Sequence, residues 1–363
     1  MIIKESPEDF RVEEVLDLEI KNKGNYAYFI LEKKAWTTLK AISSIARILR
    51  VSEKRFTFAG QKDRQGITRQ YVSAYQISVR SLYNIRLKDI KIEFLGYGDK
   101  PIHLGDLKGN KFEIVIRELK RPLTIVHAIP NYYDDQRFGG FRPNMHLAGK
   151  QVLLGNYEEA VRIKLLNPYS HETDDYIEAR ESMEENWGNW GKIRLPTCMT
   201  IEKRIVGHLV NHPKDFKGAL KALPRQLFTM LTHSYQSYIF NKSLSEYLKK
   251  NNQGFREVNY SLGKLIFVNK YFKKDWPIVG YDSKLEGQAK EIIERIMREE
   301  GIWYDTFRCP IPALSSEGLT RRAMVKVEDF KASHLERRKG VQDVSFFLPK
   351  GSYATIVLKA MAL

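Results

Sequence analysis

The chain has 363 residues, of which 43% are hydrophobic and 29% charged, with 60 Lys and Arg against 44 Asp and Glu, a formal net charge of +16. This composition excludes a mainly disordered chain, and the length suits two domains. No apolar run is long enough for a membrane helix, the first residues lack the apolar stretch of a signal peptide, and two cysteines, Cys198 and Cys309, are too few for a disulfide framework or a four-ligand zinc site. We therefore expect a soluble cytoplasmic protein with reduced cysteines and no membrane contact.

The first part of the chain is predicted to consist mainly of strands. Short β-branched and aromatic runs predict strands at residues 9–16, 26–31, 55–59, 70–79, 91–95 and 111–117. Residues 38–50 differ, because apolar residues recur three and four positions apart behind two threonines, which predicts an amphipathic helix. Several strands with few helices indicate an α/β (α+β) fold with a largely antiparallel sheet.

After His146 the pattern becomes helical. Apolar residues at helical spacing predict helices at residues 158–166, 228–250 and 284–300. The acidic segment 172–185 is predicted to be a solvated helix, ending in a packed pair formed by Trp187 and Trp190. Beyond Gly318 the chain returns to a basic stretch, a strand at 344–348, a turn at 349–351 and a last helix.

The positive charge is unevenly distributed. Residues 1–147 carry 26 basic and 18 acidic side chains, residues 148–318 carry 25 and 22, and residues 319–363 carry 9 and 4. Lys and Arg side chains that neutralise phosphates release counterions, so such an excess favours a nucleic acid as partner. The alternative is a Lys-rich surface adapted to heat, which does not explain why the excess lies in the two flanks.

Several enzyme classes lack their required patterns. The sequence contains no GxxxxGK[ST] phosphate loop, no GxGxxG turn after its first strand and no GxSxG elbow. His208 and His212 stand four residues apart, but without an adjacent Glu or a third ligand we interpret them as structural. We therefore expect no metal and no nucleotide cofactor.

Residues 58–70 form a strand end, a polar loop bounded by glycines and a strand start. Asp63 lies there among Lys62, Arg64 and Arg69. Such cations favour an ionised carboxylate, which can attack carbon, and they can also hold an RNA phosphate. Composition alone favours a simpler interpretation, in which Asp63 is an exposed turn residue in a local salt cluster.

Six blocks of residues change that balance. They are KESPEDFRVEE (4–14), GQKDRQGITRQ (60–70), LKGNKF (107–112), NYYDDQRFG (131–139), RRAM (321–324) and LPKGSYAT (348–355). Their residues and their order across nearly the whole chain resemble the TruD family of pseudouridine synthases.

The resemblance implies a specific activity. Members isomerise a uridine in RNA, typically at position 13 of transfer RNA, with a catalytic Asp and neither cofactor nor metal. Asp63 matches that Asp. The implied architecture is a discontinuous pseudouridine-synthase domain (1–147 and 319–363), with a mostly antiparallel mixed sheet flanked by helices, and a mainly helical α+β insertion domain (148–318). We expect a monomer that binds transfer RNA and needs no protein partner.

The resemblance also implies roles for other residues. Lys4 would orient Asp63 or bind substrate, unless it is an ordinary exposed lysine. Tyr133 stands where the family has Phe, and it would stack on the base and either assist deprotonation or not. Asn131 would hold a loop or bind the base. Asp134 stands where the family has Gly. Because Asp takes a positive φ less readily than Gly, the resemblance does not fix the conformation of that turn. The further residues expected at the RNA are Phe10, Gln61, Lys62, Arg64, Arg69, Lys108, Asn110, Arg137, Phe138, Arg321, Arg322 and Ser352.

Two other functions compete with a tRNA pseudouridine synthase. One is a basic RNA-binding protein that keeps the fold without the chemistry, which an intact Asp63 disfavours. The other is an unrelated nuclease that uses Asp with a metal ion.

Overall fold

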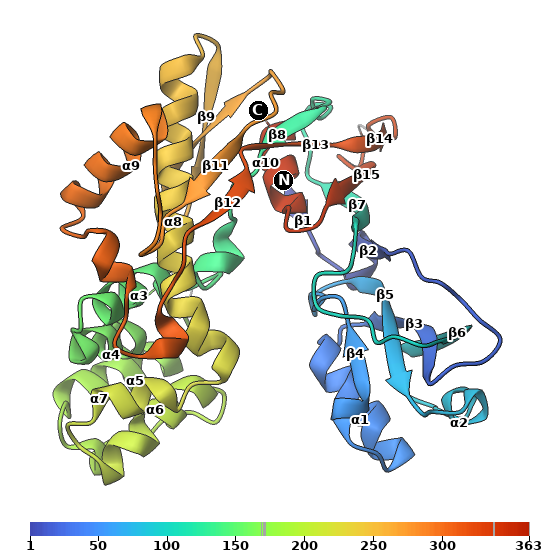
Figure 1. Ribbon diagram of the computed structural model, residues 1–363, viewed down its shortest axis with the longest axis horizontal. Coiled ribbons are helices and arrows are strands. Elements are labelled where there is room, and N and C mark those ends of the chain that lie inside the picture. Colours follow the sequence, from blue (N-terminus) through green and yellow to red (C-terminus); the bar gives the residue numbers. More distant parts are fainter. Residues whose placement is uncertain (168, 170–171, 337, 363) are drawn as a thin grey trace. The chain divides into compact units, whose positions relative to one another are not determined.

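The computed structural model describes residues 1–167, 169, 172–336 and 338–362, which form two compact units. The first unit comprises Met1–Ile129 and Val325–Leu363, and the second comprises Pro130–Met324 (Figure 1). The chain passes between them in two short strands, β8 (Ala128–Pro130) and β13 (Met324–Lys326).

The first unit is built on a nine-stranded sheet. The strand order is β14-β15-β7-β2-β5-β3-β6, with β1 beside β7 and β4 beside β5. Only the pairing of β2 with β5 is parallel, so the predicted mixed, mostly antiparallel sheet is confirmed. The strands are β1 (Ile2–Ile3), β2 (Phe10–Val15), β3 (Tyr26–Lys34), β4 (Phe56–Phe58), β5 (Ile67–Tyr75), β6 (Ile90–Gly98), β7 (Gly109–Arg117), β14 (Glu328–Ala332) and β15 (Gln342–Pro349).

Helices complete this unit. They are α1 (Thr38–Leu49), α2 (Val79–Tyr83), α10 (Ala354–Met361) and the short 3-10 helices η1 (Pro7–Asp9) and η2 (Glu53–Arg55). The predicted helix at 38–50 is confirmed as α1, whose Ile42 and Ile45 are buried in one core with Phe29 and other strand residues. The strand predicted at 70–79 ends earlier, because the Ser78 hydroxyl caps α2.

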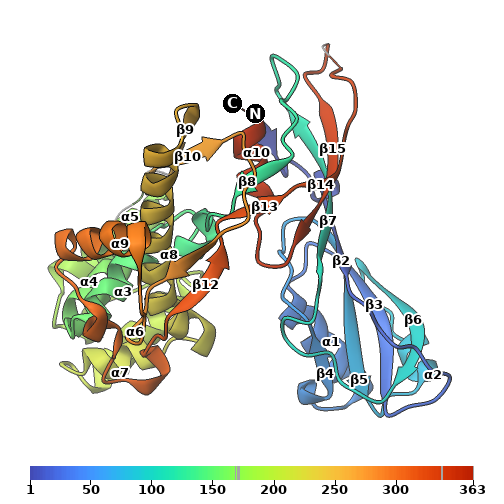
Figure 2. The same cartoon turned by 45° about the horizontal axis from the view of Figure 1, so that its top comes forward.

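The second unit is organised around the long helix α8 (Arg225–Asn251), which has α9 on one side and β11 and β12 on another (Figures 1 and 2). Helix α3 packs very closely against α8: a Cβ atom added at Gly149 would lie only 2.0 Å from the Leu231 carbonyl oxygen. The other elements are α3 (Met145–Leu153), α4 (Tyr157–Leu166), α5 (Asp174–Glu185), α6 (Thr200–Asn211), α7 (Phe216–Lys221), α9 (Gly287–Glu299), β9 (Phe255–Tyr260), β10 (Gly263–Val268), β11 (Asp275–Ile278), β12 (Leu319–Arg322), η3 (Asp135–Phe138), η4 (Trp190–Lys192), η5 (Tyr304–Phe307) and η6 (Pro312–Leu314).

The boundaries of this unit differ from the domain boundaries expected from the sequence. Those lay after residue 147 and before residue 319, and both positions fall inside the second unit. The reason is packing: α3 begins before residue 147 and packs against α8, and β12 pairs with β11. The block at 131–139 and Arg321 therefore belong to the helical unit rather than to the sheet.

Three smaller expectations can be compared with the structure. The rings of Trp187 and Trp190 pack edge to face with centroids 4.7 Å apart, as predicted. His208 pairs with Asp215 at 2.9 Å, and across the described residues no cluster of three His, Cys, Asp or Glu side chains could hold a metal. In the same part of the chain, none of the helices combines the length and apolarity needed to cross a bilayer.

Candidate active site

The loop between β4 and β5 carries Asp63 and is fixed by side chains from neighbouring elements. Gln70 on β5 donates from Nε2 to the Gly60 carbonyl oxygen at 3.0 Å. The Thr38 hydroxyl at the start of α1 accepts from the Lys62 backbone N–H at 3.0 Å and donates to the Gln70 Oε1 at 2.7 Å. A strand and a helix therefore hold the backbone on the N-terminal side of Asp63.

A buried lysine holds the backbone at Asp63 itself. Lys33 on β3 is 1% exposed, and its ammonium donates to the carbonyl oxygens of Trp36 (2.6 Å), Lys62 (3.3 Å) and Asp63 (2.9 Å). Burial lowers the pKa of Lys33 to about 8, although the nearby charge of Asp63 opposes the shift. Lys33 is not among the site residues predicted from the sequence. Its only signal was the Lys33-Lys34 pair at a strand end, where alternation turns one of two lysines inward.

Lys4 contacts the Asp63 carboxylate directly. Its Nζ lies 3.2 Å from Asp63 Oδ2, and the two side chains are 12% and 43% exposed. The ammonium also lies 4.0 Å from the centre of the Phe10 ring. Lys4 has a backbone φ of 60°, a left-handed conformation that is costly for a residue other than glycine. Lys4 is therefore not an ordinary exposed lysine. Phe10, expected at the RNA, is instead buried at 3% exposure beneath it.

Lys62 does not direct its charge at Asp63. Its ammonium lies 2.5 Å from Glu14 Oε2 and 2.8 Å from Asn110 Oδ1, and the side chain is 7% exposed. Glu14 also accepts from the backbone of β5, so it joins the loop to the sheet. Lys62 and Asn110, both predicted to bind RNA, are thus joined in a buried polar cluster that supports the loop.

The hydrogen bonds of Arg69 and Arg64 go to other groups of the first unit. Arg69 on β5 binds Glu32 at 3.0 Å and Glu93 at 2.8 Å, on the strands β3 and β6. Arg64 is exposed and makes one long hydrogen bond, 3.4 Å, to the Ala35 carbonyl oxygen. Strand pairing therefore commits Arg69 to glutamates on β3 and β6.

The other predicted RNA contacts of the first unit lie at its surface. Gln61 is exposed in the Asp63 loop. Lys108 is exposed and pairs with Asp17 at 2.5 Å. Ser352 is half-buried in the turn after β15, where its backbone N–H donates to the Pro349 carbonyl oxygen at 3.3 Å. Their positions leave Gln61 and Lys108 accessible to a ligand.

In the second unit, helix α8 fixes the backbone of Tyr133. The buried Asn241 side chain accepts from the Tyr133 N–H at 2.9 Å and donates to the Tyr133 carbonyl oxygen at 2.8 Å. The Tyr133 ring meets Phe240 edge to face, with centroids 5.5 Å apart, and the residue is 9% exposed. These contacts hold the ring in one orientation.

Two arginines lie against the Tyr133 ring. Arg321 donates to the Asn131 carbonyl oxygen at 2.8 Å and to Asn131 Oδ1 at 2.7 Å, which places its guanidinium 4.3 Å from the ring centre. The Arg137 guanidinium lies 5.3 Å from the same centre, and its Nε donates to the Ser237 hydroxyl at 3.0 Å. Asn131 therefore orients Arg321, a structural role that the sequence analysis had left open beside base binding.

The turn after Tyr133 does not need a glycine at position 134. Asp134 has an ordinary extended backbone, with φ −97° and ψ 173°, and the positive φ values fall at Gly139 and Gly140. The departure from the family block at Asp134 therefore leaves the turn intact.

Phe138 is fully buried, so it belongs to the core and not to an RNA surface. Arg322 is exposed and pairs with Asp275 at 3.1 Å.

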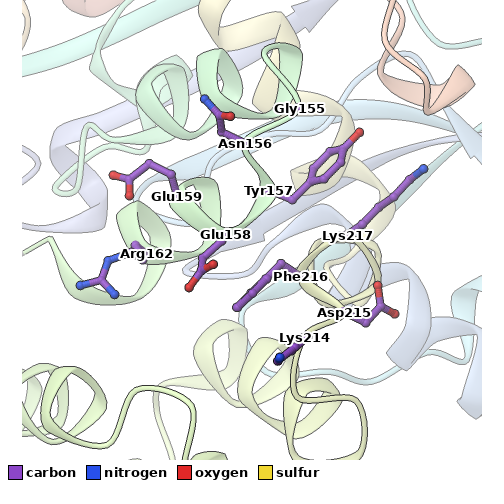
Figure 3. A pocket seen from close by; sticks show the side chains of 10 residues that line it. All are labelled: Gly155, Asn156, Tyr157, Glu158, Glu159, Arg162, Lys214, Asp215, Phe216 and Lys217. Atoms are coloured by element: carbon purple, nitrogen blue, oxygen red, sulfur yellow. The ribbon is translucent and has the colours of Figure 1, made fainter.

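A hollow of about 530 Å³ lies between the start of α4 and α7 (Figure 3). Its lining carries equal numbers of cations and carboxylates: Arg162, Lys214, Lys217, Glu158, Glu159 and Asp215. Because the two signs alternate around it, this hollow offers no attractive field for a polyanion.

Comparison with known proteins gives a consistent answer over nearly the whole chain. The sequence profile of the family described as tRNA pseudouridine synthase D (TruD) matches residues 1–260 and 253–361. Two proteins named probable tRNA pseudouridine synthase D are each 33% identical to this chain. The alignment with the Methanopyrus kandleri protein covers 93% of this chain and 86% of that protein. The alignment with the Nanoarchaeum equitans protein covers 100% of this chain and 99% of that protein. A crystal structure of a Methanosarcina mazei tRNA pseudouridine synthase D superposes with a TM-score of 0.74 at 28% identity, covering 99% of this chain and 93% of that one.

Proposed function

Because this chain belongs to the tRNA pseudouridine synthase D (TruD) family, we propose that it converts a uridine of transfer RNA, at position 13, to pseudouridine, with Asp63 as the catalytic group. The observation that carries the proposal is the way Asp63 is held. Its loop backbone is fixed by Lys33 at 2.9 Å, and its carboxylate is held by Lys4 at 3.2 Å.

The reaction needs a carboxylate at a defined place. The bond between the ribose C1′ and uracil N1 breaks, the base turns, and C1′ bonds to C5. C5 gives up its proton and N1 takes one up, so the composition of the nucleoside is unchanged. Asp63 acts as nucleophile, either on the pyrimidine ring or on the sugar, and the bond it forms breaks again before the product leaves, which restores the carboxylate. A nucleophile held within hydrogen-bond geometry before substrate arrives avoids much of the entropic cost of the encounter. Lys4 and Lys33 supply that positioning from opposite ends of the residue, side chain and backbone.

The second unit contributes binding groups. Arg321 and Arg137 place two positive charges beside the Tyr133 ring, which suits a phosphate next to a stacked base. We infer that transfer RNA is the partner, that the protein acts as a monomer without cofactor or metal, and that it works in the cytoplasm, where mature transfer RNA is found. The net charge of +16 supports binding to a polyanion.

Release of tritium from transfer RNA labelled at uridine C5 tests the activity. The wild type is expected to release tritium and Asp63→Asn to release none, while both bind the RNA equally. Asp99→Asn is a matched control, because Asp99 is another exposed carboxylate bound to a lysine, Lys21, at 2.8 Å. Tritium release by Asp63→Asn at the wild-type rate would remove Asp63 from the chemistry.

The same samples separate the competing functions. RNA binding without tritium release from either protein would indicate a binding protein that lacks the chemistry. RNA fragments on a denaturing gel that disappear with EDTA would indicate a nuclease. Sequencing of the product for pseudouridine then tests position 13.

A further inference from the structure

The second unit contains a cavity of about 430 Å³ that begins at Tyr133 and Arg137 and includes residues to which the proposed function gives no role. Its other walls come from α8, from the end of β11 and the turn that follows, and from residues 312–319. All of its lining residues belong to Pro130–Met324, whereas Asp63 belongs to the other unit. Because Tyr133 and Arg137 are already assigned to the target base and a neighbouring phosphate, the lining that the proposed function leaves unused is the part with His233 and Tyr281.

One part of the cavity is polar and cationic. Arg137 uses Nε to bind the Ser237 hydroxyl at 3.0 Å, but its two terminal nitrogens have no hydrogen-bond partner among the residues that the structure describes. The ring nitrogens of His233 likewise have none within that part of the chain. Burial and the charge of Arg137 lower the pKa of His233, so at neutral pH its imidazole offers one donor and one acceptor. These groups match the oxygens of a phosphate or a ribose.

Another part is aromatic and apolar. The Tyr281 ring is held by two neighbours, because its hydroxyl donates to Glu317 at 3.1 Å and the Arg308 guanidinium lies 4.6 Å from its centre. Leu319 is 64% exposed and Ile278 completes this lining. A fixed ring beside an exposed leucine and a buried isoleucine is the kind of platform on which proteins stack unpaired bases.

We propose that this cavity binds one unpaired nucleotide of the RNA substrate other than the target uridine, with its phosphate at Arg137 and His233 and its base against Tyr281. The inference rests on the proposed function. The volume of the cavity lies in the range of ordinary ligand sites, which is about 300–1,000 Å³. The subsite selects a transfer RNA in which the corresponding nucleotide is unpaired and able to leave its stack.

Substitutions at Tyr281 test the aromatic wall. Tyr281→Ala is expected to raise KM by about 5- to 100-fold, the range found when one stacking ring is removed, with the loss falling on KM rather than on kcat. Tyr281→Phe keeps the ring and is expected to restore most of the affinity. Tyr83→Ala is the control, since Tyr83 is 55% exposed on α2 of the first unit.

A double-mutant cycle identifies the nucleotide. A series of transfer RNAs is made, each with one unpaired nucleotide replaced by an abasic position. The affinity of each RNA is measured for the wild type and for Tyr281→Ala. One position is expected to weaken wild-type binding and to cause little further loss in the variant, because the two changes remove the same contact. Arg137→Gln is expected to lower the slope of log affinity against log salt by about one, as for one lost phosphate contact.

The outcomes keep this inference separate from the proposed function. If the wild type releases tritium but Tyr281→Ala has the wild-type KM, or if every abasic position adds independently, the subsite is refuted and the activity stands. If the wild type releases no tritium, the proposed function fails, while the binding cycle still decides the subsite. The subsite would also be refuted if free mononucleotides bound to the wild type and not to Tyr281→Ala, while no RNA position showed coupling to Tyr281.

Discussion

Replacing Lys33 with Met tests the claim that a buried cation positions the catalytic loop. The substitution keeps an unbranched side chain, one atom shorter, and removes three hydrogen bonds, to the carbonyl oxygens of Trp36, Lys62 and Asp63. Each lost bond to a buried carbonyl costs about 1–2 kcal/mol. Removing the charge gives back part of this, because a pKa fall from 10.5 to about 8 corresponds to about 3 kcal/mol of desolvation penalty. We expect a net loss of about 0–3 kcal/mol at pH 7.

The stability difference should depend on pH with a definite sign. The folded protein lowers the pKa of Lys33, so between about pH 8 and pH 10.5 the unfolded chain holds the proton more often than the folded one. Wild-type stability from this group therefore rises with pH across that window and is lost as pH falls through 8. The gap between wild type and Lys33→Met should widen by about 2 kcal/mol from pH 7 to pH 10. Urea unfolding at the two pH values measures it.

Activity gives the second measurement. Without its anchor the Asp63 backbone shifts, and a displacement of about 1 Å at a catalytic group costs about 100-fold in rate. Lys34→Met is the matched control, because Lys34 is the adjacent lysine but is exposed and paired with Glu8. The reasoning would be refuted if Lys33→Met released tritium as fast as Lys34→Met and unfolded at the same urea concentration at both pH values.

Three further predictions concern the loop and the Tyr133 cluster. Gly66→Ala should lower the unfolding free energy by about 2 kcal/mol or more, because Gly66 has φ +147° and a Cβ there would lie 2.5 Å from the Phe10 carbonyl oxygen; unchanged urea unfolding would contradict this. Arg321→Lys should raise KM for transfer RNA about tenfold, since lysine cannot reproduce the paired bonds to Asn131; a wild-type KM would show that the pairing is dispensable. Tyr133→Phe should keep kcat within about threefold, because the ring remains; a loss of about 100-fold or more would instead make the hydroxyl a general base.

The sequence predicted the fold where local signals agree with the packing. Helix α1 shows this, since Thr37 caps it and its apolar side chains recur at three- and four-residue spacing, and both features appear in the structure. The strand expected at 70–79 was too long, because the Ser78 cap that begins α2 lies inside a run of β-branched residues. Short helices of this kind are decided by a single hydrogen bond, which composition does not reveal.

In the candidate site, some residues could be predicted from the sequence and others could not. Both Lys4 and Asp63 could be named from the blocks that they occupy, and the structure brings them within 3.2 Å. The pairing of Asn131 with Arg321 joins blocks 190 residues apart, and nothing in either block indicates the other as its partner. Lys33 could not be found, because whether a lysine at a strand end turns inward depends on which carbonyl oxygens the neighbouring loop presents.

The insertion of the second unit has a consequence for how the protein is made. Strand β7 is completed on one side only by β15, which pairs with it from Gln342 to Pro349, after the whole of Pro130–Met324 has been synthesised. Until β15 has been made, β7 is therefore an edge strand of the sheet in addition to β6, and such edges invite association with other chains. The second unit is continuous in sequence and is ready to fold during that interval. The strand β7 thus changes from an edge strand to an interior strand only after the second unit has been synthesised.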